Sequence, residues 1–335
     1  MFAGVGRIVL LAVVAACGSE ADSVGDGERN SAMTIDLGIR PFLTSAPLYI
    51  AMEEGYFADE GLDVRIHLLA GHSATSLVLL EHGDIDVVTG SIFLGLFNAI
   101  NEGSGIRIVA DKGHFERGGC SPYALVVRSD LAGKLRAPAS VRGLRIDINP
   151  SLVEGYFVES WLEGSGLSLD DLDVRAMPLP ARHDAMNRGL LDLSTTSEPW
   201  LSRLLADGHQ VLVSAGQVIP GMQYGLLLFG PELRVERREA GRRFIRAYLR
   251  GVQQYNRGKT PRNMEILGRA LELDPAILKR ACWPSMRNDG MMDTEPMQGF
   301  QKWGFDKGLV DRVLEPEEYW DPSLVNEVGA GRSTR

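Results

Sequence analysis

One segment decides the predicted fold of this 335-residue chain, namely residues 35–64 with the sequence IDLGIRPFLTSAPLYIAMEEGYFADEGLDV. Apolar residues alternate with small or polar ones over residues 35–39, and this pattern predicts a β-strand. Thr44 and Ser45 are good N-cap residues, and the proline that follows suits a first helical turn. A helix is therefore predicted up to the glycine at position 55, and a second strand over residues 62–66.

The same order of strand, turn, helix and strand returns about 110 residues further along the chain. A strand is predicted at 144–148, and Ser151 with Glu154 has the spacing of a helix capping box. Three residues of the first tract match three of the second at one constant offset: Gly83, Asp86 and Ser91 match Gly189, Asp192 and Ser197. Strands that alternate with helices predict parallel βαβ units, so the chain is predicted to form two α/β lobes of similar build.

Breaks in this alternation indicate the limits of the two lobes. Residues 116–224 form the predicted second lobe, and residues 33–115 together with 225–328 form a discontinuous first lobe. Predicted strands at 123–127 and 225–229 follow the two connections between the lobes, one outgoing and one returning. Two crossover strands of this kind are what a hinge between lobes requires.

The N-terminus has the pattern of a targeting segment. Residues 8–16 are an unbroken apolar run, which is too short for the roughly 20 residues that span a bilayer. Residues 1–16 are therefore predicted to be a signal peptide. The sequence VAACG around Cys17 resembles a bacterial lipobox, so Cys17 would carry lipid and residues 17–32 would form a flexible tether. An ordinary secretory signal with a chance cysteine is the alternative.

Charge and cysteine content narrow the class of protein. The net charge of −9 argues against a nucleic-acid partner. Two further cysteines, Cys120 and Cys282, could pair in an oxidising compartment, but their positions alone leave this open. The six histidines show no metal-binding spacing and no nucleotide-binding glycine motif opens a helix. No metal and no cofactor are therefore predicted.

Ligands of open parallel sheets bind beyond the carboxyl ends of the strands, where loops lead into helices. Helix starts in such loops present free N–H groups that can hold an oxyanion. Glu198 is suited to a donor group on a ligand, and the aromatic residues to stacking on a flat ligand. The candidate ligand-binding residues are Phe42, Thr44, Ser45, His72, Ser73, Gly90, Ser91, Ser151, Leu152, Arg182, Ser197, Glu198, Trp200 and Tyr224. The alternative is that each hydroxyl only caps a helix and each aromatic ring belongs to a core.

Several short motifs together resemble the NMT1/THI5-like family and the nitrate, sulfonate and taurine solute-binding proteins of ABC importers, of the SsuA type. They are PLYIA at 47–51, GYF at 55–57, EGLDV at 60–64, GDIDV at 83–87 and YWDPSL at 319–324. The likeness covers about residues 33–328. It implies the type II periplasmic-binding-protein fold, with two α/β lobes that close on a small ligand. It also implies a monomeric, lipid-anchored receptor on the periplasmic or cell-surface face of the cytoplasmic membrane, which delivers its ligand to an ABC permease and ATPase.

The ligand itself does not follow from this resemblance. The family includes receptors for alkanesulfonates, nitrate and bicarbonate, and for pyrimidine and flavin precursors. We therefore predict a non-catalytic receptor that captures a small polar or anionic organic molecule in the cleft between the lobes. The alternative is an enzyme on the same fold, of the pyrimidine-precursor synthase or menaquinone-pathway dehydratase type, and a sensor ectodomain is a third possibility. Three isolated cysteines cannot supply the cysteine-rich motif of the synthases.

Overall fold

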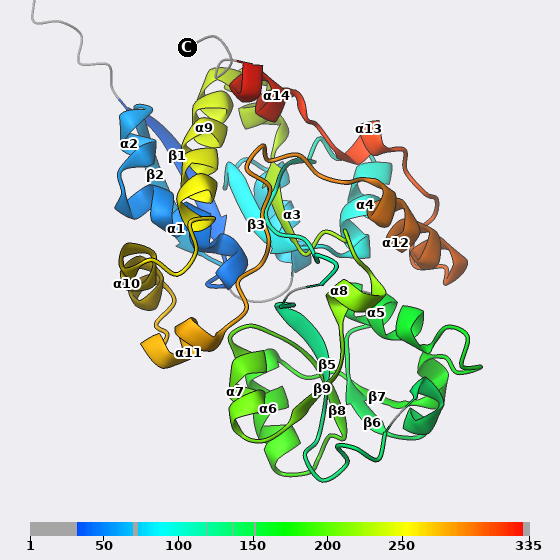
Figure 1. The fold of residues 1–335 in the computed structure, drawn as a ribbon. Coiled ribbons are helices and arrows are strands. Elements are labelled where there is room, and N and C mark those ends of the chain that lie inside the picture. Colours follow the sequence, from blue (N-terminus) through cyan, green and yellow to red (C-terminus); the bar gives the residue numbers. More distant parts are fainter. Residues whose placement is uncertain (1–31, 70–72, 119, 136, 151, 331–335) are drawn as a thin grey trace, which may run out of the picture. The chain divides into compact units, whose positions relative to one another are not determined.

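A computed structural model describes residues 32–69, 73–118, 120–135, 137–150 and 152–330 of the chain (Figure 1). Residues 32–335 form one compact unit. The predicted signal peptide, Cys17 and nearly all of the predicted tether lie outside the described residues. Within the described part, none of the helices combines the length and the apolar character that crossing a bilayer would require.

The first sheet contains five strands in the order β2-β1-β3-β10-β4. Their bounds are β1 Met33–Ile39, β2 Leu62–Leu68, β3 Val87–Ser91, β4 Arg107–Asp111 and β10 Gly225–Phe229. Strand β1 runs parallel to β2 and β3, while β10 is antiparallel to both β3 and β4. The chain therefore leaves this sheet after β4 and returns to it, more than a hundred residues later, between two strands already in place.

The second sheet has the same build, in the order β7-β6-β8-β5-β9. Its strands are β5 Tyr123–Val127, β6 Arg145–Asp147, β7 Asp173–Arg175, β8 Leu193–Ser197 and β9 Gln210–Ser214. Strand β6 is parallel to β7 and β8, and β5 is antiparallel to β8 and β9. The predicted α/β fold with two similar lobes is confirmed. Strand β9 was not predicted. Its sequence QVLVS directly precedes the returning connection between the lobes, which hides the strand pattern.

Helices follow most strands of both sheets. In the first lobe a 3-10 turn η1 Leu43–Ser45 leads into α1 Ala46–Glu53, followed by α2 Tyr56–Asp59, α3 Ser73–Glu81 and α4 Leu94–Asn101. The second lobe contains η2 Pro138–Val141, α5 Val153–Leu162, η3 Leu169–Asp171, α6 Leu179–Asn187, α7 Trp200–Ala206 and α8 Ala215–Val218. The C-terminal part contains the π-helical turn η4 Glu232–Glu236, then α9 Arg238–Tyr255, α10 Pro261–Ala270, α11 Pro275–Arg280, α12 Glu295–Asp306, α13 Pro316–Tyr319 and α14 Ser323–Ala330.

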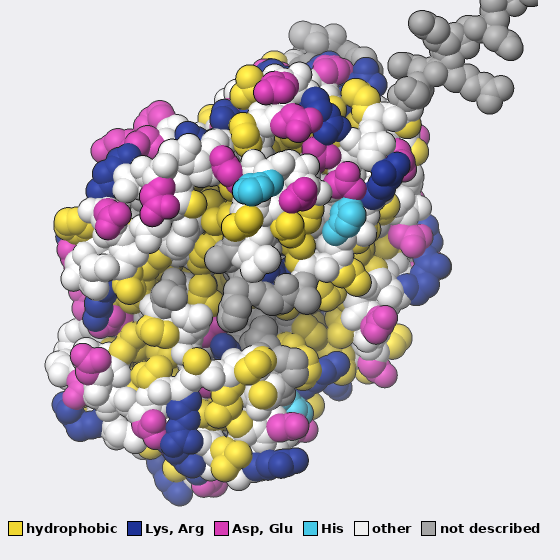
Figure 2. Space-filling model, turned by 180° about the vertical axis from the view of Figure 1, so that it is seen from behind, with side chains coloured by type: hydrophobic (Ala, Val, Ile, Leu, Met, Phe, Trp, Pro, Cys, Tyr) yellow, Lys and Arg dark blue, Asp and Glu magenta, His cyan; other side chains and the backbone are white. Residues whose placement is uncertain are grey.

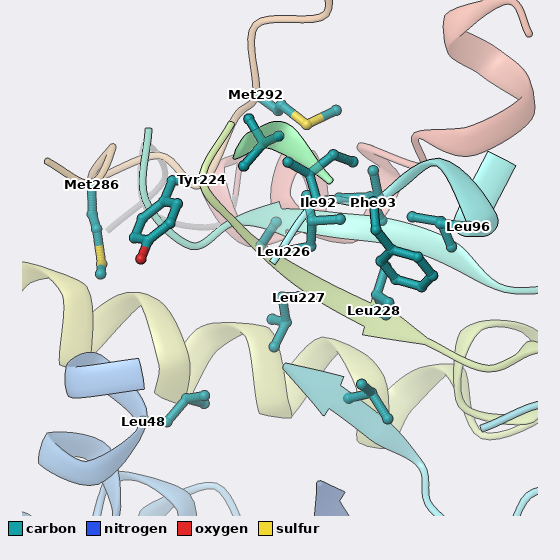
Figure 3. Packing of buried hydrophobic residues seen from close by; sticks show 14 of the residues in the cluster. Leu48, Ile92, Phe93, Leu96, Tyr224, Leu226, Leu227, Leu228, Met286 and Met292 are labelled. Atoms are coloured by element: carbon teal, nitrogen blue, oxygen red, sulfur yellow. The ribbon is translucent and has the colours of Figure 1, made fainter. Parts of the chain in front are cut away.

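Apolar residues along one stripe of residues 237–257 predict an amphipathic helix that packs on the first lobe, and helix α9 closes one face of the first sheet. Figure 3 shows Leu227 of β10 directed toward α9 and Leu48, while Ile92 lies on the opposite side of the strand. Gly251 allows α9 to approach α1 closely, because a Cβ atom there would lie 2.2 Å from the carbonyl oxygen of Pro47. Helix α9 therefore belongs to the core of the first lobe.

Some predicted helix starts are confirmed and others are not. The sequence Asp274-Pro275 predicts a helix start with aspartate as N-cap and proline at the first position, and Asp274 does cap α11 through a 2.7 Å hydrogen bond from the Ala276 N–H. Ser45 stands at the N-cap of α1 without a capping bond. The predicted capping box at Glu154 stays a prediction, because it requires the serine before Leu152; Leu152 itself stands at the N-cap of α5 and makes no side-chain cap. The serine before Leu152 lies outside the described residues.

Candidate functional site

The two connections between the lobes pair with each other. The N–H of Tyr224 donates to the carbonyl of Gly113 at 2.8 Å, and the N–H of Phe115 donates to the carbonyl of Met222 at 3.0 Å. The outgoing and returning segments therefore form a short two-stranded ribbon. Such a ribbon can bend while it keeps the lobes in register, which suits a hinge.

Asp111, at the end of β4, holds the base of this hinge together. Its buried carboxylate accepts the N–H of Gly113 at 2.9 Å and of Arg287 at 2.7 Å, and also accepts a hydrogen bond from the Gln223 amide. His114 lies 3.5 Å from the same carboxylate, whose hydrogen bond raises the pKa of the imidazole. These donors offset the cost of burying the carboxylate.

A disulfide between Cys120 and Cys282 adds a covalent link beside the hinge, with a Cα–Cα distance of 5.6 Å. It joins the segment before β5 to the segment after α11, and so settles the pairing that the sequence left open. Glu198 reinforces this link, because its buried carboxylate accepts the Cys282 N–H at 2.9 Å. The same carboxylate accepts two bonds from Ser202 in α7. The predicted ligand contact at Glu198 is thus occupied by the protein itself.

A second, noncovalent contact joins α5 of the second lobe to α12 of the C-terminal part. The Trp303 indole N–H donates to Glu159 Oε2 at 2.7 Å, and the Lys307 ammonium lies 2.5 Å from the other oxygen of that carboxylate. The Tyr156 ring packs against the Trp303 ring at a centroid distance of 5.7 Å. We call these four residues the α5–α12 latch.

A cavity of about 60 Å³ lies between residues of the two lobes, several times the space that one water molecule needs. Its lining residues are Phe42, Ser91, Ile92, Tyr123, Leu152, Val153, Glu154, Ser197 and Tyr224. Two of them, Tyr123 and Tyr224, stand at the start of β5 and directly before β10, and the others come from the loop before α1, the ends of β3 and β8, and the start of α5. These are the strand ends and helix starts at which ligands of such sheets bind.

Aromatic rings form one wall of the cavity. Tyr224 packs against Phe115 and Tyr123 at centroid distances of 5.1 and 5.6 Å. Burial raises the pKa of both tyrosine hydroxyls, so they remain neutral donors. The Tyr123 hydroxyl is buried and makes no hydrogen bond of acceptable geometry with the described residues, although Thr195 lies close to it. A buried hydroxyl without a partner is costly, and a ligand could satisfy it.

The second lobe places a compensated ion network behind the cavity. The buried Arg182 guanidinium lies 3.2 Å from Glu154 Oε2, donates to the Thr195 carbonyl at 2.9 Å, and pairs with Asp147. Burial raises the pKa of Asp147 to about 7, against the opposing effect of Arg182. The predicted ligand-binding residue Arg182 therefore lies behind Glu154, held by two carboxylates.

The first lobe places a lysine behind its side of the cavity. Lys112 is fully buried, and its Nζ donates to Thr44 Oγ1 at 2.8 Å and to Ser45 Oγ at 3.5 Å. The two hydroxyls that were predicted to cap α1 or bind ligand are therefore acceptors for this amine. Burial lowers the pKa of Lys112 to about 7.

The structure brings part of the predicted site together. The predicted residues in the cavity lining are Phe42, Ser91, Leu152, Ser197 and Tyr224. Thr44, Ser45 and Arg182 support the wall from behind. Gly90 pairs with Leu226 inside the first sheet, and Trp200 packs against His183 and Arg203. His72 and Ser151 lie outside the described residues, and of Ser73 only the backbone, at the start of α3, is described.

Sequence reasoning missed Lys112 and Tyr123 and gave Glu154 only a capping role. Lys112 and Tyr123 flank the outgoing hinge segment, and their position next to strand ends was the available signal. Their burial and partners depend on contacts far along the chain. Within the described residues, no cluster of histidine, cysteine or acidic side chains is arranged to hold a metal ion. Figure 2 shows acidic and basic side chains interspersed over one face of the molecule.

Comparisons with known proteins add to this geometry. The family model described as NMT1/THI5 like matches residues 43–257. The bicarbonate-binding protein CmpA of Synechococcus elongatus is 24% identical over 209 residues, which cover 56% of this chain and 46% of that protein. The chain thus spans about half the length of this curated relative.

Solved structures share the fold at low sequence identity. The ligand-binding component of an ABC-type import system from Staphylococcus aureus has a TM-score of 0.72 at 15% identity, covering 88% of this chain and 99% of that one. The desulfurization enzyme DSZB has a TM-score of 0.66 at 14% identity, with coverage of 90% and 99%. Both binding proteins and an enzyme therefore adopt this architecture.

Proposed function

We propose, from the premise that this chain belongs to the NMT1/THI5-like family, that it is the solute-binding component of an ABC importer. It captures one small polar or anionic molecule between its lobes and presents it to a permease and ATPase. The observation that carries this proposal is the cavity lined by residues of both lobes, with Tyr123, whose buried hydroxyl lacks a hydrogen-bond partner among the described residues, in its wall. A ligand that fills the cavity would satisfy that hydroxyl and contact both lobes at once.

Ligand capture would proceed by closure about the hinge ribbon. The lobes would separate when the α5–α12 latch and the β-bridge between Phe93 and Leu152 break, while the ribbon and the disulfide stay intact. Ligand would first contact the first-lobe residues Phe42 and Ser91, and closure would then add Ser197 and Glu154 from the second lobe. Because closed lobes contact more of the ligand than open ones, binding shifts the population toward the closed state.

We further propose that Cys17 carries a lipid that anchors the protein, as a monomer, to the outer face of the cytoplasmic membrane. The apolar run before Cys17 and the lipobox-like sequence support this assignment.

The receptor proposal includes the lobe limits at residues 116 and 224. They coincide with the hinge ribbon, whose hydrogen bonds lie between residues 113 and 225.

A thermal-shift screen of residues 32–335 tests the receptor function. Sulfonates, nitrate, bicarbonate, aromatic carboxylates, pyrimidines and flavin precursors are the test compounds, since a ligand raises stability according to its concentration over Kd. A hit should bind more weakly to the Ser91→Ala, Ser197→Ala variant, by about 1–2 kcal/mol for two lost hydrogen bonds. Ser140→Ala, on the exposed surface, is the matched control. Equal affinity of all three proteins would contradict the site.

An enzyme on the same fold is the competing proposal, favoured by the likeness to DSZB. The screen separates the two, because a receptor returns its hit unchanged while an enzyme converts it. Incubating each hit with the protein and analysing the mixture by mass spectrometry provides the readout. Turnover that the cavity variant loses would replace the receptor assignment with an enzymatic one.

A further inference from the structure

Lys112 occupies an unusual place for a lysine. It follows β4 directly, is fully buried, and lies just behind the first-lobe wall of the cavity. A Cβ atom at Gly225 would be 3.3 Å from its Nζ. Gly225 follows the lining residue Tyr224 and is paired in register with the lining residue Ser91. The amine is thus separated from the cavity by one layer of residues.

The groups packed around Lys112 do not supply a full countercharge. Thr44 and Ser45 contribute only neutral hydroxyls. Asp111 favours the charged amine, yet no carboxylate oxygen of the described residues lies within 4 Å of Nζ, and the Asp111 oxygens are bound to other donors. Arg40, after β1, disfavours the charge. The Tyr248 hydroxyl, from α9, donates to the Asp111 carbonyl and stays neutral.

The two sides of the cavity therefore differ in charge balance. On the second-lobe side, Arg182 is paired with the carboxylates of Asp147 and Glu154. On the first-lobe side, Lys112 has two hydroxyl partners, one positive neighbour, Arg40, and one negative neighbour, Asp111, whose oxygens are bound to other donors. An ammonium buried in this way is unstable unless a negative charge approaches it. The cavity is a place where a charge from outside the protein can approach this amine.

We infer that Lys112 determines the charge selectivity of the cavity, by taking up a proton from solvent when a small oxyanion binds. The inference rests on the proposed receptor function. The amine, R–NH2, becomes R–NH3+, and no other bond changes. Lys112 does not touch the ligand, so it acts as a positioning residue through the low-dielectric wall, where charges interact strongly. The cavity volume of about 60 Å³ suits an anion of only a few heavy atoms.

The lowered pKa of Lys112, about 7, sets the pH above which anion affinity should begin to fall. Below that pH the amine is already charged and anion affinity should not depend on pH. Above it, each bound anion requires one proton, so affinity should fall close to tenfold for each pH unit. A lysine that only fills space would produce no such slope.

Calorimetry with nitrate and methanesulfonate, whose charge stays constant between about pH 6 and 9, tests this on residues 32–335. Urea, an uncharged molecule of similar size to nitrate, is the neutral probe. We expect an anion to bind with uptake of about one proton at pH 8.5, and Lys112→Met to weaken it at least tenfold and remove the pH slope. Lys134→Met, at an exposed position, should change neither quantity.

The possible failures are distinguishable. Anion affinity and slope that survive Lys112→Met would overturn the inference and leave the receptor function standing. So would urea binding as tightly as nitrate. If none of the screened compounds binds, both proposals fall. Should Lys112→Met not fold, NMR of 13C-lysine in the unaltered protein follows the Lys112 amine directly, and an ordinary lysine pKa would refute the inference.

Discussion

Removing the Cys120–Cys282 disulfide should destabilise the protein strongly. The two cysteines are 162 residues apart, so the crosslink restricts nearly half of the chain in the unfolded state. The chain-entropy relation gives about 17 cal/mol/K for a loop of this length, or about 5 kcal/mol at 25 °C. Measured values for native disulfides are commonly about 2–5 kcal/mol. We therefore expect Cys120→Ser, Cys282→Ser to lower the free energy of unfolding by about 3–5 kcal/mol.

Urea unfolding of residues 32–335, followed by circular dichroism, measures this loss. This part of the chain contains only the two cysteines, so exchange with a third thiol does not interfere. The unaltered protein in dithiothreitol should match the double variant, and the double variant itself should not respond to the reductant. A loss below about 1 kcal/mol would refute the reasoning, since it would mean that the unfolded chain gains little freedom without the crosslink.

Three further predictions follow, two from single contacts and one from the sequence around Cys17. Gly251→Ala should cost about 1–3 kcal/mol in urea unfolding, because its Cβ would lie 2.2 Å from a carbonyl oxygen of α1. Gly329→Ala, with open space around it, should be close to neutral, and equal effects would contradict the packing. Arg182→Met should cost about 3–5 kcal/mol near pH 8, because two buried carboxylates lose their partner. The loss should shrink toward pH 5, since the pKa of Asp147, already raised to about 7, rises further and the group protonates; a loss independent of pH would refute this. Cys17→Ser should move the protein from the membrane fraction to the soluble fraction, and unchanged fractionation would remove the lipid-anchor proposal.

The sequence carried most of the information on the fold because its signals are local. Alternating apolar residues and glycine stops predicted most of the strands and the helices between them, and the near-repeat of residues 35–64 predicted the second sheet. Helices α10, α12, α13 and α14 of the C-terminal part were not predicted. Strand β9 escaped because two of its five residues are polar and it adjoins the hinge segment. Loop positions next to the cavity were equally accessible, since the carboxyl ends of strands can be read from the pattern.

The identity of each side chain's partner was not accessible in this way. Thr44 and Ser45 have the residue types of helix caps or ligand-binding hydroxyls. Their hydroxyls instead accept hydrogen bonds from Lys112, which is 68 and 67 residues away in the sequence. Glu198 has the residue type of a ligand acceptor, yet the N–H of Cys282 reaches it across 84 residues. Residue type indicates which hydrogen bonds a side chain can form with positions nearby in the sequence. The tertiary fold determines which distant donor lies within hydrogen-bond distance of it.

The contacts between the lobes differ in a way that bears on how the cavity opens. The hinge ribbon consists of two segments of continuous backbone, and the disulfide beside it is a covalent bond. The α5–α12 latch consists of one indole hydrogen bond, one partly exposed ion pair and ring packing. Each contact of this kind contributes on the order of 1 kcal/mol to the free energy that holds the lobes together. Opening the cavity therefore requires the latch and the isolated β-bridge between Phe93 and Leu152 to break, while the Asp111 carboxylate and its donors hold the hinge segments together. A ligand needs to add only a few kcal/mol to keep the latch closed, which leaves the closed state reversible.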